Sequence, residues 1–410
     1  MNSYSSYKDS GVEWIGEIPN DWSLKKVKYL FSTEKNQISV KEFEENEVIH
    51  YSIPNVQEFG IGQLENGNDI DSSKLLLNGN ELLVSRLNPR KKTVCISELN
   101  NEHMIVGSGE FIVLVPNDMN LGYCYYQFVT GGMTQNLDSL VESVTKSHQR
   151  VRPERVFNTL YIEPPKYEIE QIVSFLDTKT QKIDELIEQT EQKIELLKEK
   201  RTSLINHCVT KGLNPNVEMK DSGVEWIGEI PNHWGTTKLK YQGDVIIGLS
   251  YKPENQVDEG QGILVMRSSN VQNGKPSFKD NVYVDCEISE KLKIKENDIL
   301  ICSRNGSRRL IGKNCLIPKE IEGMTWGVFM TVYRSKSPKF FHWLLNSPVF
   351  ESQSGLFLTS TINQLTVSTL QNMVVPYVYE LEEQNQIIEY LNEQTQKIDS
   401  TIEKETQRTE

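Results

Sequence analysis

The sequence predicts an α+β protein made of two tandem units, each a globular part followed by a long helix that pairs with the other long helix. Three observations support this prediction. Apolar residues recur at heptad spacing between residues 176 and 208, two separate sequence words each occur twice, and the stretches between them contain short strand-like runs divided by turn residues.

The first long helix is predicted over residues 166–212. No Pro or Gly interrupts it, and Gly212 followed by Pro215 ends it. At 1.5 Å per residue, residues 176–208 would form a rod about 50 Å long. A narrow apolar seam on such a rod cannot bury itself, so we expect a second helix to cover it. The predicted seam positions, at alternating spacings of four and three, are Leu176, Thr180, Ile183, Ile187, Thr190, Ile194, Leu197, Arg201, Leu204 and Cys208.

The partner helix is predicted at residues 377–410, where the pattern of the first helix returns after a shift of 215 residues. The word Gln-Lys-Ile-Asp at 181–184 recurs at 396–399, and the apolar positions around it recur as well. The predicted seam residues of this second helix are Leu391, Ile398 and Ile402.

A second repeat shows independently that the chain is duplicated. The word KDSGVEWIGEIPNDW at 8–22 returns at 220–234 with a single change, Asp21 to His233. Agreement of this length does not arise by chance, and it predicts a tandem repeat. The predicted segments are two globular domains, 1–165 and 213–376, and two helices, 166–212 and 377–410.

The globular parts contain strand-like runs at 81–84, 93–96 and 110–115, and residues 123–129 fit either a strand or a helix. A hydrophobic content of 37%, the absence of a long apolar run and a polar N-terminus predict a soluble protein without a signal peptide. Six cysteines without a CxxC pair favour reduced thiols in a cytoplasm. The six histidines are scattered, and we predict no metal site.

The net charge of −13 argues against nucleic acid only until its distribution is considered. Seven basic and nine acidic residues lie in 166–205, and three basic and nine acidic residues lie in 377–410. Most of the excess acid therefore lies on the two helices, as a solvated face with i,i+4 pairs. The globular parts are closer to neutral, and their basic residues are clustered.

Basic stretches without acidic residues occur in both globular parts, directly after a strand-like run. A single such cluster would be explained as a solubilising surface. The arrangement occurs twice, however: the strand-like run at 80–84 precedes the basic loop that contains Arg86, and the run at 297–301 precedes the basic stretch at 303–313. Each unit also contains the word Asn-Val-Gln. Arg and Lys neutralise phosphates, and Arg, Asn and Gln suit guanine and adenine edges. The predicted DNA-binding residues are Asn55, Gln57, Arg86, Arg90, Lys91, Lys92, Lys146, His148, Gln149, Arg150, Arg152, Asn270, Gln272, Arg304, Asn305, Ser307, Arg308, Arg309 and Lys313.

No catalytic motif accompanies these residues. A phosphate-binding GxxxxGK[ST] loop is missing, because 306–313 has the wrong spacing. Glu163-Pro164-Pro165-Lys166 differs at its first and fourth residues from the loop of amino-methyltransferases, and we interpret it as the turn that starts the first helix. The sequence therefore predicts a binding protein with no catalytic residues.

The arrangement resembles the specificity (S) subunit of type I restriction–modification enzymes, over nearly the whole chain. The resemblance rests on Gly16 to Trp22 and Gly228 to Trp234, the Pro-to-Glu-Gln helix starts, the paired Gln-Lys-Ile-Asp helices, and the basic loop at 303–306. It implies two target-recognition domains, separated by two conserved helices packed antiparallel with pseudo-twofold symmetry. Each domain would bind one half of a split double-stranded DNA site.

The same resemblance implies that the chain is not an enzyme by itself. It would recruit two methyltransferase (M) subunits and the restriction/translocase (R) subunits of a site-specific deoxyribonuclease and adenine-DNA methyltransferase. S-adenosylmethionine, ATP and Mg²⁺ would belong to those partners, with no cofactor in this chain, in the cytoplasm of a bacterium or archaeon. The alternative is a two-domain coiled-coil adaptor that binds proteins and ignores DNA; it explains the seam and the acidity but not the repeated basic loop.

One departure concerns the second helix, which ends at Glu410, so the repeat supplies no counterparts to Leu197, Arg201 and Leu204. We expect the far end of the first helix to be covered by another subunit or by N-terminal residues, unless the chain is short.

Overall fold

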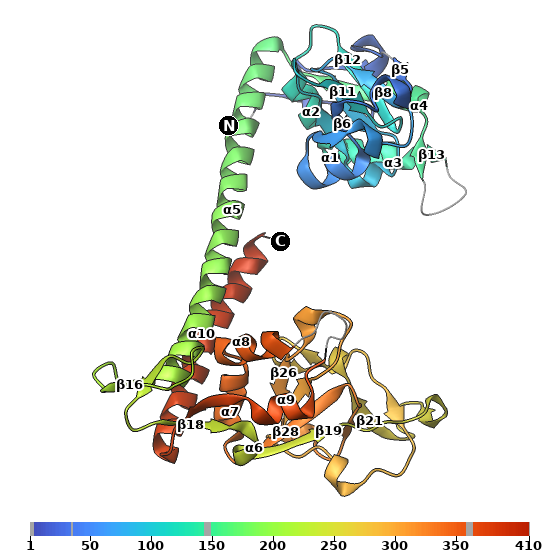
Figure 1. Ribbon diagram of the computed structural model, residues 1–410. Coiled ribbons are helices and arrows are strands. Elements are labelled where there is room, and N and C mark those ends of the chain that lie inside the picture. The colour runs from blue at the N-terminus through green and yellow to red at the C-terminus, as the bar shows by residue number, and fades with distance from the viewer. Residues whose placement is uncertain (1–3, 34–35, 143–148, 358–363, 410) are drawn as a thin grey trace. The chain divides into compact units, whose positions relative to one another are not determined.

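The computed structural model describes residues 4–33, 36–142, 149–357 and 364–409. The chain divides into two compact units, 1–185 and 186–410, each described below by itself. The division falls inside the longest helix, α5 (Lys166–Lys211), so part of this helix belongs to each unit. Both units combine sheets with helices (Figure 1), which confirms the predicted α+β class.

Unit 1 contains two main β-sheets, of strand order β10-β9-β12-β4 and β5-β8-β11-β6-β7. Its remaining strands form the pairs β1-β2, β3-β15 and β13-β14. The strands are β1 (Tyr7–Asp9), β2 (Glu17–Pro19), β3 (Ser23–Lys26), β4 (Phe31–Ser32), β5 (Gln37–Ile38), β6 (Glu47–Tyr51), β7 (Gln63–Asn66), β8 (Lys74–Leu77), β9 (Leu82–Ser85), β10 (Val94–Ile96), β11 (Met104–Gly107), β12 (Phe111–Pro116), β13 (Val141–Glu142), β14 (Arg150–Val151) and β15 (Leu160–Glu163). The helices before α5 are α1 (Ile53–Phe59), α2 (Leu121–Val129), α3 (Gly131–Ser139) and α4 (Pro153–Asn158).

The sequence of strand β9 is apolar without interruption because both faces of the strand are buried. Leu82 and Val84 pack into the cluster that contains α2 and α3 residues, whereas Leu83 packs into a second cluster with residues of β6 and β11. Successive side chains of a strand point to opposite faces, so a strand buried on both faces must be apolar at every position. The strands predicted at 81–84, 93–96 and 110–115 are confirmed as β9, β10 and β12, and residues 123–129 lie in helix α2.

Unit 2 contains two four-stranded sheets, β19-β28-β25-β26 and β20-β24-β21-β27, and the pairs β16-β17, β18-β29 and β22-β23. The strands are β16 (Met219–Asp221), β17 (Glu229–Pro231), β18 (Gly235–Lys238), β19 (Gly243–Ile247), β20 (Gln256–Val257), β21 (Ile263–Met266), β22 (Val271–Gln272), β23 (Lys275–Pro276), β24 (Tyr283–Val284), β25 (Ile299–Cys302), β26 (Asn314–Leu316), β27 (Thr325–Trp326), β28 (Met330–Ser335) and β29 (Val374–Tyr377). The helices are α6 (Leu239–Gln242), α7 (Pro338–Leu345), α8 (Pro348–Phe357), α9 (Val367–Asn372) and α10 (Leu381–Thr409).

The tandem repeat is visible in the backbone. The hairpin β1-β2 of unit 1 has its counterpart in β16-β17, and β9 between β10 and β12 has its counterpart in β25 between β26 and β28. The turns before β9 and β25 also match, because Asn80 and Asn297 both take left-handed backbone conformations, at φ 62° and 66°. Strand β25 alternates like β9, with Ile299 and Leu300 packed into different clusters.

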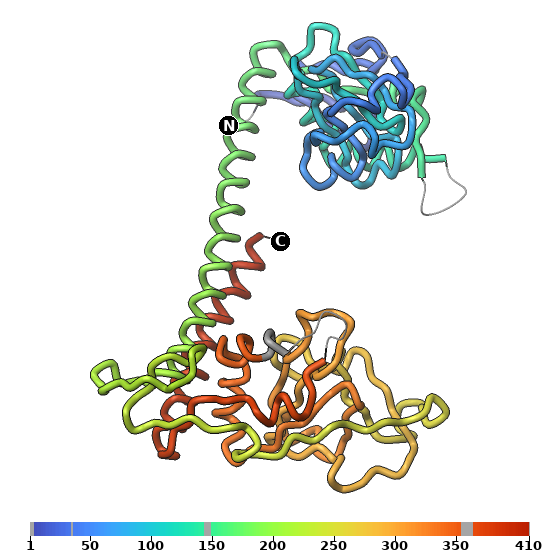
Figure 2. The backbone as a smooth tube through the Cα atoms, viewed as in Figure 1, coloured from blue at the N-terminus to red at the C-terminus, as the bar shows by residue number. Residues whose placement is uncertain are grey.

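Within unit 2, the end of α5 packs against α10 in antiparallel orientation, and both traces run side by side in Figure 2. Lys193 Nζ lies 2.6 Å from Glu405 Oε1, and Arg201 Nε lies 2.8 Å from Asp399 Oδ1. Residue numbers rise along α5 while those of their partners fall along α10, which fixes the direction. Arg201, for which the repeat supplied no counterpart, therefore has a partner on α10, whereas we expected another subunit or N-terminal residues to cover this end of the first helix.

The predicted seam residues differ in burial. Leu391 and Ile398 are buried, and the half-buried positions are Leu176, Ile187, Ile194, Leu197, Leu204 and Ile402. Ile183 is 55% exposed and Thr180 is exposed, so the expectation that these two positions are covered within the chain is wrong. The reason is the antiparallel pairing, which brings α10 to the C-terminal part of α5.

Candidate nucleic-acid interface

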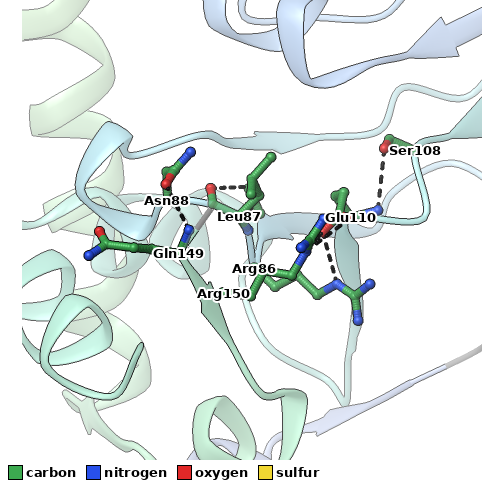
Figure 3. A network of polar contacts seen from close by, with 8 residues as sticks. Arg86, Leu87, Asn88, Ser108, Glu110, Gln149 and Arg150 are labelled. Atoms are coloured by element: carbon green, nitrogen blue, oxygen red, sulfur yellow. Dashed lines mark hydrogen bonds and ion pairs between the residues drawn. The ribbon is translucent and has the colours of Figure 1, made fainter. Parts of the chain in front are cut away.

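The two basic stretches of the first globular part, far apart in sequence, lie side by side in unit 1 (Figure 3). The backbone N–H of Asn88 donates to the Gln149 carbonyl at 2.7 Å, and the N–H of Val151 donates to the Arg86 carbonyl at 2.9 Å. Arg86 in turn donates its backbone N–H to the carbonyl of Glu110 at 2.9 Å. Three segments thus meet: the residues after β9, the residue before β12, and β14. We call this junction the clasp of unit 1.

Glu110 binds two arginines of the unit 1 clasp (Figure 3). Its carboxylate accepts from Arg86 Nε at 3.1 Å and from Arg150 Nε and Nη2 at 3.0 and 2.8 Å. Hydrogen bonds from Arg150 and Arg86 hold the pKa of the Glu110 carboxyl below its ordinary value, because they stabilise the ionised form more than partial burial penalises it. One carboxylate therefore orients both guanidinium groups and offsets half of their charge.

The other predicted residues near this clasp differ in how much of their polar surface is engaged. Arg90 donates to the side-chain carbonyl of Gln149, and Arg152 Nε lies 2.6 Å from Glu142 Oε2. Lys91 and Lys92 are exposed. Lys146 and His148 lie outside the described residues.

In the two asparagine–glutamine pairs, the side-chain amide of each asparagine is engaged within its own unit. Asn55 is half-buried, and its amide donates to the His50 carbonyl at 3.0 Å and to Glu65 Oε1 at 2.6 Å. Asn270 is 0% exposed, and its amide donates to the carbonyls of Ser277 and Asp280 at 2.9 and 3.1 Å. For Asn270 the prediction of a DNA contact is wrong, because its side chain is fully buried and holds a turn together. For Asn55, whose amide nitrogen is engaged within unit 1, a DNA contact stays a prediction.

The glutamines of these pairs are exposed. Gln57 Nε2 donates to Thr93 Oγ1 at 2.9 Å, and Gln272 Nε2 donates to the Ser269 carbonyl at 3.1 Å. Each retains its side-chain carbonyl at the surface of its own unit, so a DNA contact by Gln57 and Gln272 stays a prediction.

Unit 2 contains a clasp built in the same way. The N–H groups of Ser303 and Arg304 both donate to the Phe329 carbonyl at 3.0 Å, and the N–H of Leu365 donates to the Ser303 carbonyl at 2.7 Å. Arg304 also forms an antiparallel bridge with Gln364. Phe329 stands directly before β28, as Glu110 stands directly before β12. The backbone frame of the two clasps is the same, whereas the side chains differ.

The Arg304 side chain stacks on an aromatic ring. Its guanidinium carbon lies 5.1 Å from the centroid of the Phe329 ring, within the range of cation–π contact. The Phe329 ring is 53% exposed and Arg304 is exposed. The next residue, Asn305, donates its amide to Ser268 Oγ at 3.0 Å, which fixes the loop against the end of β21.

Arg304 and Asn305 line a cleft of about 960 Å³ in unit 2. Its walls combine apolar and aromatic side chains with a small number of polar groups, the composition typical of binding sites. The lining residues are Leu249, Ser250, Tyr251, Pro253, Gln256, Arg267, Ser268, Ser269, Asp280, Arg304, Asn305, Gly306, Gly327, Val328, Phe329 and Met330. Of the other predicted residues in this loop, Ser307, Arg308 and Arg309 are exposed and Lys313 is half-buried.

The lining residues that sequence reasoning missed include Tyr251, Arg267 and Phe329. Arg267 follows β21 directly, and its Nη2 lies 2.9 Å from Asp280 Oδ2. A signal for Arg267 exists, because a strand followed by an arginine and serines is the same device as the one at 299–304. Arg267 stands alone, however, and the sequence prediction rested on clusters of basic residues.

Two further findings bear on the chemistry available. In the segments 4–33, 36–142, 149–357 and 364–409, no group of three or more His, Cys, Asp or Glu residues could hold a metal ion. Among the same residues, no helix combines the length and the apolar character needed to cross a membrane.

No protein-family model matches the chain. Individual relatives do match. A Methanocaldococcus jannaschii protein named for the specificity subunit of the type I restriction enzyme MjaX is 25% identical over 307 residues, which cover 71% of this chain and 68% of that one. The StySPI specificity subunit of Salmonella potsdam is 28% identical and the EcoKI specificity subunit of Escherichia coli is 27% identical. These two matches each span 42% of this chain and 39% of the relative, less than half of either.

Solved structures share the fold over almost the whole chain. A chain from a study of complex assembly and conformational transition of the type I R-M system aligns with a TM-score of 0.74 at 16% identity, covering 96% of this chain and 94% of that one. The HsdS subunit of Thermoanaerobacter tengcongensis aligns with a TM-score of 0.54 at 14% identity over the same shares. By its sequence relatives and by its fold, this chain is a relative of the specificity subunits of type I restriction enzymes.

Proposed function

We propose that the chain is the DNA specificity subunit of a type I restriction–modification system. Unit 1 and unit 2 each read one half of a split double-stranded site, and the chain performs no bond chemistry itself. Sequence relatives with this role in their names, and the candidate interfaces of the two units, support the proposal.

The observation that carries the proposal is the repeated clasp. In both units the chain leaves a central strand and at once presents arginine side chains at a junction of three segments. In unit 1 the side chains at the junction are those of Arg86, Glu110 and Arg150, whereas unit 2 has Arg304 and Phe329. One backbone frame with unlike side chains is what two readers of unlike half-sites require, since base edges are distinguished by side-chain donors and acceptors.

The charge distribution agrees with this role in spite of the acidic total. Lys91 and Lys92 are exposed beside the unit 1 clasp, and Arg309 is exposed beside the unit 2 clasp. Cations at these positions would neutralise phosphates and fix the register of the duplex, while the clasp side chains approach the base edges.

The long helices would bind partner subunits. Ile183, Leu186 and Leu196 of α5 are 55%, 63% and 64% exposed, so three large apolar side chains of this helix are available to a partner. We propose that two methyltransferase subunits cover this helix and that restriction/translocase subunits join for cleavage. S-adenosylmethionine, ATP and Mg²⁺ would then be bound by those subunits, and the assembly would act in the cytoplasm on chromosomal and incoming DNA.

Methylation mapping tests the proposal. The chain is expressed with its methyltransferase partner in a host that lacks this activity, and genomic adenine methylation is mapped at single-base resolution. The expected result is one motif made of two short blocks separated by unspecified base pairs, absent when the chain is omitted. A protein-binding adaptor without DNA recognition predicts the same methylation pattern with and without the chain, and that result would refute the proposal.

A further inference from the structure

The two clasps can be superposed residue by residue through their backbone hydrogen bonds. Ser85 pairs with Phe111 in unit 1, as Cys302 pairs with Met330 in unit 2. It follows that Glu110 and Phe329 occupy equivalent positions, each immediately before a central strand. Arg304 stands at the position of Leu87, one residue after the counterpart of Arg86. The side chain at the position of Glu110 and Phe329 determines whether the neighbouring arginine side chains are held by an ion pair or by stacking.

In unit 1 the residue at this position is Glu110, and its carboxylate binds the side chains of Arg86 and Arg150. Glu110 accepts one hydrogen bond from Arg86 and three from Arg150, which donates through Nε to both oxygens and through Nη2 to one. Arg150 is held in a bidentate way, and its Nε and Nη2 groups are then not available to the O6 and N7 atoms of guanine. Arg86 is held through Nε alone.

In unit 2 the equivalent position is aromatic, and it orients an arginine without using its donors. The Arg304 guanidinium lies over the Phe329 ring, and the structure shows it no ion pair or side-chain hydrogen bond within the described parts of the chain. Stacking restricts the rotamers of a long side chain, so less conformational entropy is lost when its N–H groups bind a ligand.

The other residues that line the cleft leave the Arg304 guanidinium as the one available to bind a ligand. Among the described residues that line the cleft, two are arginines, and the other, Arg267, is paired with Asp280 at 2.9 Å. Asn305 is engaged with Ser268 and holds the loop in place. The exposed Phe329 and Val328 beside Arg304 offer an apolar surface of the kind that contacts a thymine methyl group.

We propose that the residue before β12 and β28 sets the specificity of each clasp, an inference that rests on the proposed DNA-reading role. Phe329 presents Arg304 to a guanine in the half-site read by unit 2. Glu110 fixes the orientation of Arg86 and Arg150, and it occupies the Nε and Nη2 donors of Arg150, so that pair does not read a guanine.

The test uses the assembled complex of the full chain with its methyltransferase partner. Dissociation constants are measured for a duplex carrying the motif found by methylation mapping, and for duplexes in which each specified base pair is changed in turn. We expect Arg304→Ala to weaken binding of the motif duplex about 5- to 150-fold. We also expect it to abolish discrimination at one G·C pair of one block, leaving all other positions unchanged.

Phe329→Glu places a carboxylate beside Arg304, at the position that Glu110 occupies in unit 1. The new carboxylate would bind Arg304, so this variant should lose discrimination at the same G·C pair as Arg304→Ala. Arg309→Ala is the matched control, because it removes one exposed cation from the same loop. It should lower affinity for all duplexes by a similar factor and leave the discrimination profile intact. Circular dichroism of each variant checks that unit 2 is folded.

Glu110→Gln tests unit 1 in the same assay. Loosening Arg86 and Arg150 should raise affinity for duplexes without the motif and leave every position of the unit 2 block unchanged. Relaxed discrimination at a C·G pair would instead make Glu110 itself a base reader, and would overturn its assignment.

Two results would overturn the assignment of Arg304: an equal loss of affinity for all duplexes, which marks a phosphate contact, or no loss at all. Failure of the proposed function gives a different pattern, because the wild-type complex would then discriminate no duplex at any position.

Discussion

The indole N–H of Trp234 donates to the Glu383 carboxylate at 3.0 Å, and Trp22 forms the same bond with Glu168, also at 3.0 Å. Each tryptophan ends the duplicated sequence word, and each glutamate lies in the first turn of a long helix. The duplicated word therefore docks the β-hairpin of its unit onto the start of the helix that follows. A carboxylate there also favours the helix, because it faces the positive end of the helix dipole.

Removing the indole N–H should destabilise unit 2. Trp234 is 1% exposed, so Trp234→Phe keeps most of the packing while Glu383 loses a hydrogen bond at a half-buried site. We expect a loss of about 1–3 kcal/mol in the free energy of unfolding, measured by urea denaturation followed by circular dichroism. Trp226→Phe is the control, since Trp226 is 40% exposed; it should change stability by less than about 0.5 kcal/mol. Equal effects of the two variants would contradict this role.

A buried ion pair in unit 2 should be sensitive to loss of one partner. Asp298 is 2% exposed and accepts from Arg334 Nε at 2.8 Å and from Arg334 Nη2 at 2.6 Å. Arg334→Leu would leave the carboxylate buried without its counter-ion, and we expect about 3–5 kcal/mol of destabilisation. The double variant Arg334→Leu/Asp298→Leu should recover part of that loss. Additive losses in a double-mutant cycle would show that the two side chains do not act as a pair.

Stability should fall in mildly acidic solution because of His342. Burial, and to a lesser degree Arg201, lowers the pKa of His342 to about 4, whereas a histidine in the unfolded chain has a pKa of about 6.5. Between these values the unfolded state binds more protons, so the free energy of unfolding decreases as pH falls from about 6.5 to 4, by up to about 1.4 kcal/mol per pH unit. Above pH 7 this group contributes no slope.

Denaturation at a series of pH values measures this slope. His342→Gln should flatten the curve between pH 6.5 and 4, because glutamine does not titrate. A curve for His342→Gln that is parallel to wild type throughout would assign the acid sensitivity to other groups.

Replacing a buried residue of the predicted helix seam by alanine should cost more stability than replacing an exposed one. Leu391 is 0% exposed and packs with residues of α5 and α7, so Leu391→Ala should cost about 2–5 kcal/mol. Ile183→Ala, at a position 55% exposed, should cost less than about 0.5 kcal/mol in the isolated chain. If a methyltransferase subunit covers α5, Ile183→Ala should instead weaken assembly with that subunit, as measured by analytical ultracentrifugation.

Much of the fold could be predicted because the relevant signals are local or repeated. The apolar runs at β9 and β25 and the two turn asparagines before them, Asn80 and Asn297, stand in equivalent places in the sequence and in the structure. The heptad pattern likewise predicted α5. Sequence periodicity does not state which part of one helix a second helix covers, and for that reason the exposure of Ile183 was not predicted.

The candidate site was predicted only in part. The basic loops were found, since clustered charge is visible in sequence. Their chemistry depends on residues distant in the chain: Glu110, which neutralises part of Arg86 and Arg150, and Phe329, which orients Arg304. Asn270 was misassigned because an amide suited to reading adenine is equally suited to closing a turn, and only the folded backbone shows which.

Selection of DNA by the purified assembly tests the central claim most directly. The chain, bound to its methyltransferase partner, is allowed to select from a pool of random duplexes, and the bound sequences are read. We predict two short specified blocks separated by a gap of constant length without sequence preference, with centres about one helical turn of DNA apart. A single continuous block, or a selected pool no different from the starting pool, would contradict the account.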